Sequence, residues 1–221
     1  MKNVLEIDGV ILEFNNKRIL QNVYLKIEQG KITGLLGRNG TGKSSLMKIL
    51  FGDLIPQQKS IRLNGRSILK ANRAPKNMRY LPQSNFIPNT LSTKRVFSDF
   101  NLDFGTFTKH FSEFSKYYHS KIKHLSGGEK RIIEIYVLLV SDTKICMLDE
   151  PFSQVMPLHV ESIKNLILQE KENKGILLTD HLYKHITDIC DELYIIENGQ
   201  THLTKNKMDL ERLGYAPRSK K

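Results

Sequence analysis

One stretch of this chain has the residue types and the spacing of a phosphate-binding loop. Residues 37–44 read Gly-x-x-x-x-Gly-Lys-Ser, follow the apolar segment 32–36 and open a helical pattern over 43–51. Glycines let successive backbone N–H groups converge on one anion, and a helix start adds unpaired donors and a positive dipole end. Lys43 would bring a charge to the terminal phosphates, and the Ser44 hydroxyl would help to hold Mg²⁺. A chance glycine-rich turn is the alternative, but the strand–turn–helix setting favours nucleotide binding.

Two adjacent carboxylates end a second apolar segment. Asp149 and Glu150 follow residues 145–148, which have the composition of a buried strand. Ligands of open α/β sheets bind at the carboxyl ends of strands, so Asp149 is placed to reach Mg²⁺ and Glu150 to accept a proton from an attacking water. A pair of solvated acids is the alternative. Together with Lys43, a phosphoryl-transfer site is the better interpretation.

A second glycine-rich segment precedes another predicted helix. Residues 125–129 read Leu-Ser-Gly-Gly-Glu, directly before the helical pattern 130–140, and this predicts a second anion-binding helix start. The alternative is an ordinary cap by Ser126 with Glu129 as its capping-box partner. Capping explains those two residues. It does not explain Gly127 and Gly128, which weaken a helix.

The order of elements around these motifs predicts an α/β fold. Short strands are expected at 4–7, 10–14, 23–27, 60–63 and 78–81, with turn signals such as Asn15-Asn16 between them. Between residues 91 and 123, aromatic and apolar residues recur every three or four positions, which indicates short amphipathic helices packed in a core rather than a cofactor box. The remaining expected elements are helices 130–140 and 158–171 and strands 145–148, 176–179 and 193–196.

Composition indicates a globular protein and excludes several classes. The 221 residues are 39% hydrophobic and 26% charged, without a membrane-spanning apolar run or a signal-peptide pattern near Met1. Cys146 and Cys190 form no spaced motif, so we expect reduced thiols and no metal site on cysteine. The net charge of +11 is dispersed and lacks the aromatic residues of a nucleic-acid surface, so no nucleic-acid partner is expected. A solvated lysine-rich surface explains this charge at least as well as an anionic partner does.

Taken together, these motifs resemble the ATP-binding cassette family, the nucleotide-hydrolysing subunits of ABC transporters. Its Walker A and Walker B motifs resemble residues 37–44 and 145–149, and its L-S-G-G-Q signature resembles residues 125–129 with Glu in the last place. The resemblance implies a catalytic role for Glu150, a Q-loop glutamine at Gln83, a switch histidine at His181 and adenine stacking on Phe14. The implied nucleotide-binding residues are Phe14, Gly37, Arg38, Asn39, Gly40, Thr41, Gly42, Lys43, Ser44, Ser45, Gln83, Ser126, Gly127, Gly128 and Glu129.

The resemblance also implies an architecture and two bound species. The expected fold is an α/β P-loop NTPase core with an N-terminal antiparallel β-subdomain and a small helical subdomain inserted before the signature motif. Residues 1–214 would form one ATPase domain, with the helical subdomain at about 84–140 and a basic tail at 215–221. ATP would bind with Mg²⁺, whose ligands would be Ser44, Gln83 and Asp149.

The implied function is ATP hydrolysis that drives transport. Two cassettes would pack head to tail, so that the signature loop of each contacts the γ-phosphate of the ATP held by the other. The chain would lie in the cytoplasm, peripheral on the inner face of the cell membrane, and would act on a separate transmembrane subunit. A soluble cassette that assembles or remodels another complex is the alternative. One departure from the family pattern is Met156, which stands where an interface aspartate is expected.

Overall fold

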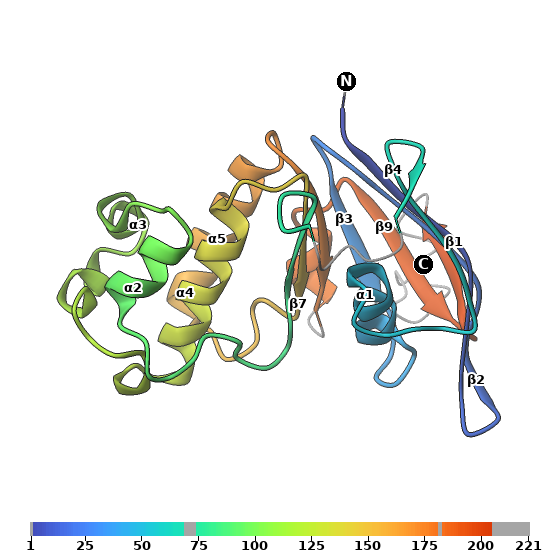
Figure 1. Cartoon of the computed structure of the whole chain (residues 1–221), viewed down its shortest axis with the longest axis horizontal. Coiled ribbons are helices and arrows are strands. Elements are labelled where there is room, and N and C mark those ends of the chain that lie inside the picture. Colours follow the sequence, from blue (N-terminus) through green and yellow to red (C-terminus); the bar gives the residue numbers. More distant parts are fainter. Residues whose placement is uncertain (1, 69–73, 181–182, 205–221) are drawn as a thin grey trace, which may run out of the picture.

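An antiparallel sheet with strand order β2-β1-β4-β5 forms one layer of the protein (Figure 1). The computed structural model describes residues 2–68, 74–180 and 183–204. The sheet consists of β1 (Val4–Phe14), β2 (Lys17–Glu28), β4 (Gln58–Leu63) and β5 (Arg66–Ser67).

β1 is a single strand, although the sequence predicted two. Its pairing with β2 shifts register between Ile7 and Val10, where Gly9 has a φ of 60°. A bulge therefore replaces the expected break, because it absorbs the extra residues without ending the ladder. The predicted turn at Asn15 and Asn16 is confirmed: both residues have positive φ, 47° and 61°, as a tight hairpin turn requires.

The second sheet has the strand order β10-β9-β3-β8-β7-β6 and is parallel except for the edge strand β10. Its strands are β3 (Ile32–Leu36), β6 (Met78–Leu81), β7 (Ile145–Asp149), β8 (Gly175–Thr179), β9 (Glu192–Glu197) and β10 (Gln200–Thr204). Every residue of β3, β7 and β8 is buried, which explains their continuous apolar sequences. β10 was not predicted from the sequence because its residues are mostly polar, as a solvated edge strand allows.

Side chains alternate across the parallel sheet and divide the interior into two cores. Ile145 and Met147 of β7 pack with the antiparallel sheet and α1 (Lys43–Phe51), whereas Cys146 and Leu148 face the other core. The second core includes α4 (Gly127–Val140), α5 (Pro157–Glu170) and α6 (Tyr183–Thr187). Figure 1 shows α1 between the two sheets. Both cysteines are free, as expected, and burial raises the pKa of Cys146 to about 12.

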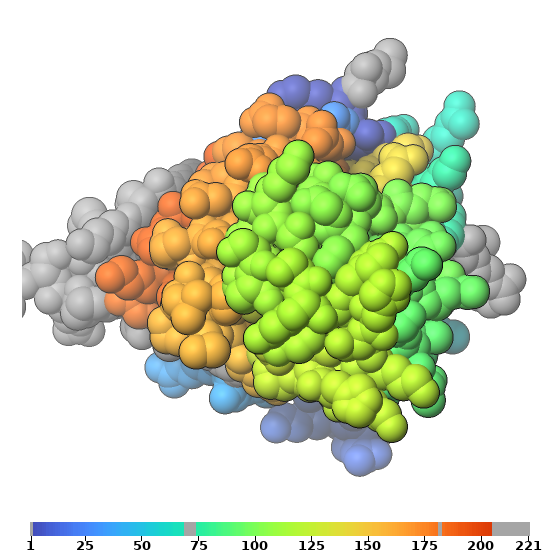
Figure 2. All heavy atoms as spheres, turned by 90° about the vertical axis from the view of Figure 1, so that its left-hand side faces the viewer, coloured from blue at the N-terminus to red at the C-terminus, as the bar shows by residue number. Residues whose placement is uncertain are grey.

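A group of short helices lies beyond α4 and α5. It consists of α2 (Thr93–Asp99), α3 (Phe104–His110) and the 3₁₀ turns η2 (Ser112–Tyr117) and η3 (Ile122–His124). Phe97 and Phe107 are buried, and their rings lie 5.9 Å and 4.8 Å from that of Tyr136 on α4. The predicted core role of these aromatic residues is therefore confirmed. Figure 2 shows the group, in green, covering one end of the molecule.

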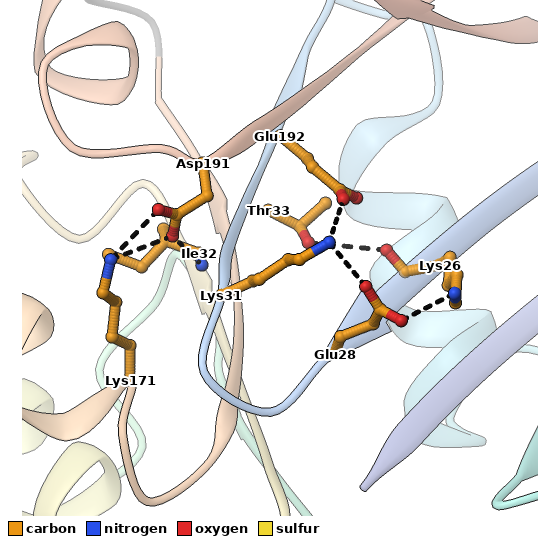
Figure 3. A network of polar contacts seen from close by, with 8 residues as sticks. All are labelled: Lys26, Glu28, Lys31, Ile32, Thr33, Lys171, Asp191 and Glu192. Atoms are coloured by element: carbon orange, nitrogen blue, oxygen red, sulfur yellow. Dashed lines mark hydrogen bonds and ion pairs between the residues drawn. The ribbon is translucent and has the colours of Figure 1, made fainter. Parts of the chain in front are cut away.

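A network of charges holds the start of β3, the strand that leads into the phosphate loop (Figure 3). Lys31 Nζ lies 2.5 Å from Glu192 and 2.7 Å from Glu28, and these hydrogen bonds raise the pKa of the ammonium. The carboxylate of Asp191 accepts from the Ile32 N–H at 2.8 Å and pairs with Lys171 at the end of α5 at 3.0 Å. A strand fixed at this end positions the loop at its other end.

Some expectations concern helix ends or residues outside the described ranges. The helix predicted from residue 130 begins at Gly127, so both signature glycines lie in its first turn. The predicted basic tail at 215–221 lies outside the described residues. Within the described ranges, every helix is too short or too polar to cross a membrane.

Candidate functional site

The phosphate loop is a left-handed turn between β3 and α1. Gly40 and Gly42 have φ values of +80° and +101°, which residues with a Cβ rarely adopt. A Cβ on Gly37 would lie 2.5 Å from Thr41 Oγ1, so this position is closed to a larger residue. Gly42 is the N-cap of α1 and carries no side-chain acceptor, and Thr41 Oγ1 donates to the Arg38 carbonyl at 2.9 Å. The first N–H groups of α1 are therefore not capped by the side chain of the N-cap residue.

Lys43 brings a buried ammonium to this loop. The residue is 6% exposed, and its Nζ donates to the carbonyl oxygens of Gly37 at 2.7 Å and Arg38 at 3.3 Å. Burial lowers the pKa of Lys43, and the carboxylates of Glu150 and Asp149 oppose this shift. The ammonium of Lys43 thus lies at the loop. A bound anion would give this ammonium a charged acceptor in place of the two neutral carbonyl oxygens.

A cavity of about 460 Å³ opens over the loop. Phe14, at the end of β1, is 46% exposed and lines this cavity, so its ring is a wall of the site and not a part of the core. This volume is within the range of small-molecule sites. The cavity is lined by Phe14, Ile19, Asn39, Gly40, Gly42, Lys43, Ser44, Ser45, Gln83 and Glu150.

The two acids at the end of β7 have different environments. Asp149 is fully buried, and its carboxylate accepts from Thr179 Oγ1 at 2.7 Å and from the Tyr80 hydroxyl at 3.1 Å. Burial and the charge of Asp149 raise the pKa of Tyr80, which stays a donor. Glu150 has a φ of +52°, a left-handed conformation that costs an L-residue roughly 1–2 kcal/mol. Such strain occurs at active sites, and here it accompanies the turn of Glu150 into the cavity.

Gln83 joins the loop to the second acid. Its Nε2 lies 2.7 Å from Glu150 Oε1 and 3.1 Å from Ser44 Oγ. Glu150 after β7, Ser44 on α1 and Gln83 after β6 thus meet at the cavity. Ser44 and Gln83 line the cavity, whereas the fully buried Asp149 is not among its lining residues. The hydroxyl, amide and carboxylate oxygens of these three residues are the donor types that Mg²⁺ prefers, so the donor set fits this ion.

The signature segment caps α4 and packs against the loop after Glu150. Ser126 Oγ accepts from the Glu129 N–H, and Glu129 accepts from the Ser126 N–H at 2.7 Å and from the Tyr117 hydroxyl at 2.7 Å. The capping box is therefore present, and the carboxylate of Glu129 is directed to its own chain. A Cβ on Gly128 would lie 2.6 Å from the Gln154 carbonyl oxygen. Close packing with Gln154 thus explains one glycine that capping left unexplained.

Two sequence expectations have different outcomes here. His181 lies outside the described residues. Met156 is 58% exposed and is the N-cap residue of α5, next to the exposed Leu158. An apolar pair therefore faces solvent where the family resemblance implied an interface loop.

Sequence reasoning missed Arg131, which is 2% exposed and donates to the carbonyl oxygens of Asp149 at 2.7 Å, Glu150 at 3.1 Å and Pro82 at 2.6 Å. Burial lowers the pKa of Arg131, and the charges of Glu134 and Asp149 oppose that shift. The available signal was a charged residue inside the apolar run of α4.

Comparisons with known proteins agree with this geometry. The family described as "ABC transporter" matches residues 20–153. The lipopolysaccharide export system ATP-binding protein LptB of Haemophilus influenzae is 28% identical over 213 residues, which cover 90% of this chain and 88% of that protein. The manganese transport system ATP-binding protein MntA of Synechocystis sp. is 30% identical over an alignment of 233 positions, gaps included, which covers 94% of this chain and 88% of that protein.

Solved structures share the fold. The structure described as the ATP-binding subunit of an ABC transporter superposes with a TM-score of 0.79 at 22% identity, covering 98% of this chain and 95% of that one. The predicted α/β architecture, with an antiparallel sheet and a mainly parallel P-loop sheet, is thereby confirmed. With its phosphate loop, paired acids and signature segment in one fold, the chain belongs to the ABC transporter family and is one of its ATP-binding, ATP-hydrolysing subunits.

Proposed function

We propose that the chain binds Mg-ATP in the cavity over residues 37–44, hydrolyses it in a head-to-tail dimer and drives transport through a separate transmembrane subunit. The convergence of Lys43, Ser44, Gln83 and Glu150 on one cavity carries this proposal. A basic group, a hydroxyl, an amide and a carboxylate are the set that binding and hydrolysis of a nucleoside triphosphate need.

Each residue of the cavity has a role in the proposed reaction. Lys43 and the donors of α1 bind the terminal phosphates, and Phe14 stacks on the base. When bound, Mg²⁺ would neutralise phosphate charge from a position near Ser44, Gln83 and Asp149. Glu150 takes the proton of the attacking water, and the amide of Gln83, at 2.7 Å, orients its carboxylate. His181 would contact the γ-phosphate in this proposal.

The dimer is proposed because the start of the signature helix is open to solvent. Ser126 and Gly127 are exposed at the start of α4, a helix of 14 residues. An ATP shared between this helix start and the phosphate loop of a second copy would make association depend on the nucleotide. The exposed Met156 and Leu158 lie just after the loop that contacts Gly128, and they offer apolar area to the same interface.

The transmembrane partner is expected at a groove next to the Gln83 segment. The groove encloses about 430 Å³ and has the aromatic walls Phe51, Phe86 and Phe100. Lys48 and Arg79 line it with one acid, Asp53, and Arg79 Nε is buried without a hydrogen-bond partner within the described ranges. An acidic segment of the membrane subunit fits this excess of positive charge. Such docking would place the chain on the inner face of the cell membrane.

Two measurements test the proposal. Light scattering after size exclusion should show the Glu150→Gln variant as a dimer with Mg-ATP and as a monomer without it, because hydrolysis no longer removes the shared anion. Cell fractionation should place the wild-type chain with membranes. A variant that stays monomeric at high ATP excludes the nucleotide-linked dimer, and a chain found only in the soluble fraction supports the alternative of a soluble remodelling ATPase.

A further inference from the structure

Two buried charged side chains on α4 bond the backbone of segments that carry Glu150 and Gln83. Arg131 and Glu134 are 2% and 1% exposed and lie one helical turn apart. Arg131 donates through Nη2 to the carbonyl oxygens of Asp149 and Glu150, at 2.7 Å and 3.1 Å, and through Nη1 to that of Pro82, at 2.6 Å. One guanidinium therefore joins the end of β7 to the residue that precedes Gln83.

Glu134 holds the other end of the Gln83 segment. Its Oε1 accepts hydrogen bonds from the backbone N–H groups of Phe86 at 2.8 Å and Ile87 at 3.1 Å. The segment from Pro82 to Ile87 is thus bonded to α4 at both ends. Between these two points lies Gln83, whose amide contacts Glu150 and Ser44 in the cavity.

Stability alone is a weak reason for this arrangement. Burying a charged pair is costly, and well-packed apolar residues often stabilise a fold as well or better. The separation between Arg131 Nη1 and Glu134 Oε2 is 3.8 Å, so the pair is loose, and their strong hydrogen bonds go to the backbone instead. The planar fork of a guanidinium holds its donors in a fixed geometry, whereas the donors of a lysine ammonium rotate on a flexible stem. The geometry is thus suited to fixing the backbone of Glu150 in its left-handed conformation.

We propose that Arg131, supported by Glu134, is a positioning residue that couples the signature helix to Glu150 and Gln83 of the same chain. This inference rests on the proposed head-to-tail dimer. There, the start of α4 contacts one ATP, while Glu150 and Gln83 face the other. Arg131 then holds the Glu150 that acts on one ATP, while Ser126 of the same chain contacts the other ATP.

Kinetics of single variants give the first test. Arg131→Met should lower kcat about 100-fold with little change in KM for ATP, because misplacing a catalytic group affects the chemical step and not the binding of phosphates to Lys43. Arg131→Lys keeps the charge without the fork of donors, and its kcat should lie between those of Arg131→Met and the wild type. The matched control is Lys174→Met: Lys174 is also 2% exposed, and it bonds the Leu139 and Ser141 carbonyls at the opposite end of α4.

The control variant should lose stability and keep its kcat. Equal losses of kcat in Arg131→Met and Lys174→Met, or a rise in KM without a fall in kcat, overturn the positioning role. If Arg131→Met does not fold, the kcat of Arg131→Lys alone tests the positioning role. A wild-type kcat in Arg131→Lys then overturns the proposal.

Mixing variants gives the second test, because each site of the dimer uses Glu150 from one chain and Ser126 from the other. Arg131→Met mixed with Ser126→Arg should recover activity, since one site then has an intact signature and a correctly held Glu150. Arg131→Met mixed with Glu150→Gln should stay inactive, since the remaining Glu150 belongs to the Arg131→Met chain. The opposite result in either mixture shows that Arg131 serves the signature loop and overturns the proposal.

A third mixture separates this inference from the proposed function. Ser126→Arg with Glu150→Gln contains one site in which neither substitution lies, and it should recover activity. If this mixture is inactive, the head-to-tail dimer with independent sites is wrong, and the single-variant kinetics still decide the role of Arg131.

Discussion

Replacing Met156 by aspartate should stabilise the fold, because this residue occupies the N-cap of α5 without capping it. Its φ and ψ of −65° and 141° are those of a normal N-cap, and its side chain makes no cap hydrogen bond. An aspartate there would accept from the N–H of Leu158, the first N–H of a helix that begins with Pro157, and lie at the positive end of the helix dipole. The His159 N–H already donates to the Met156 carbonyl at 2.9 Å, so the gain falls in the middle of the usual range, about 1 kcal/mol relative to alanine.

The comparison with alanine isolates the cap. Met156 is 58% exposed, and Met156→Ala, Met156→Asn and Met156→Asp all remove its thioether side chain. For a chain of this size, about 1 kcal/mol corresponds to a rise of roughly 2–4 °C in Tm. The free energy of unfolding measured in urea should be higher for Met156→Asp and Met156→Asn than for Met156→Ala. At high salt the difference for Met156→Asp should shrink, because the dipole interaction is screened. If neither Asp nor Asn exceeds Ala, the helix start is not where the structure has it.

The same variants test whether this loop lies at the dimer interface. We expect low ATPase activity in the isolated wild-type chain, and Met156→Asp should raise that activity or its cooperativity in ATP, since a carboxylate accepts hydrogen bonds that a thioether cannot. A change of about 1.4 kcal/mol in closed-dimer stability changes the dimer population tenfold, which light scattering resolves. Met156→Asn caps the helix without charge and serves as the control. Activity unchanged in all variants would refute the interface position of Met156.

Three further predictions concern the two glycine-rich loops and the catalytic acid. Lys43→Ala should weaken ATP binding at least tenfold in a direct titration, because a charged hydrogen bond contributes about 1.5–3 kcal/mol; unchanged affinity would exclude the phosphate loop as the site. Gly128→Ala should destabilise the fold by about 1–3 kcal/mol through its clash with the Gln154 carbonyl. Gly127→Ala meets only the flexible Gln154 side chain, at 3.2 Å, and should unfold in urea near the wild-type midpoint; equal midpoints for both variants would contradict the packing. Glu150→Gln should bind ATP and turn it over very slowly, and wild-type turnover would remove Glu150 from the mechanism.

The sequence alone determined the features that depend on neighbouring residues. The phosphate loop is one: its left-handed glycines and the contacts of Lys43 with Gly37 and Arg38 all lie within a few positions of one another. The asparagine turn between β1 and β2 and the capping box of Ser126 are others. Such features follow from backbone sterics and local hydrogen bonds, so residue types and spacing were sufficient to predict them. The continuous apolar strands likewise predicted a buried parallel sheet.

The tertiary structure decided what joins distant parts of the chain. Gln83 reaches Glu150 across 67 positions, and Arg131 reaches Pro82 across 49, and neither contact follows from periodicity or motif spacing. Gly128 is another case, because a Cβ at this position would clash with the carbonyl of Gln154, which lies on a different loop. These contacts exist because the strand order places β6 beside β7 and lays α4 against them. A long-range hydrogen bond depends on the relative position of whole elements, and only packing of the complete core fixes that position.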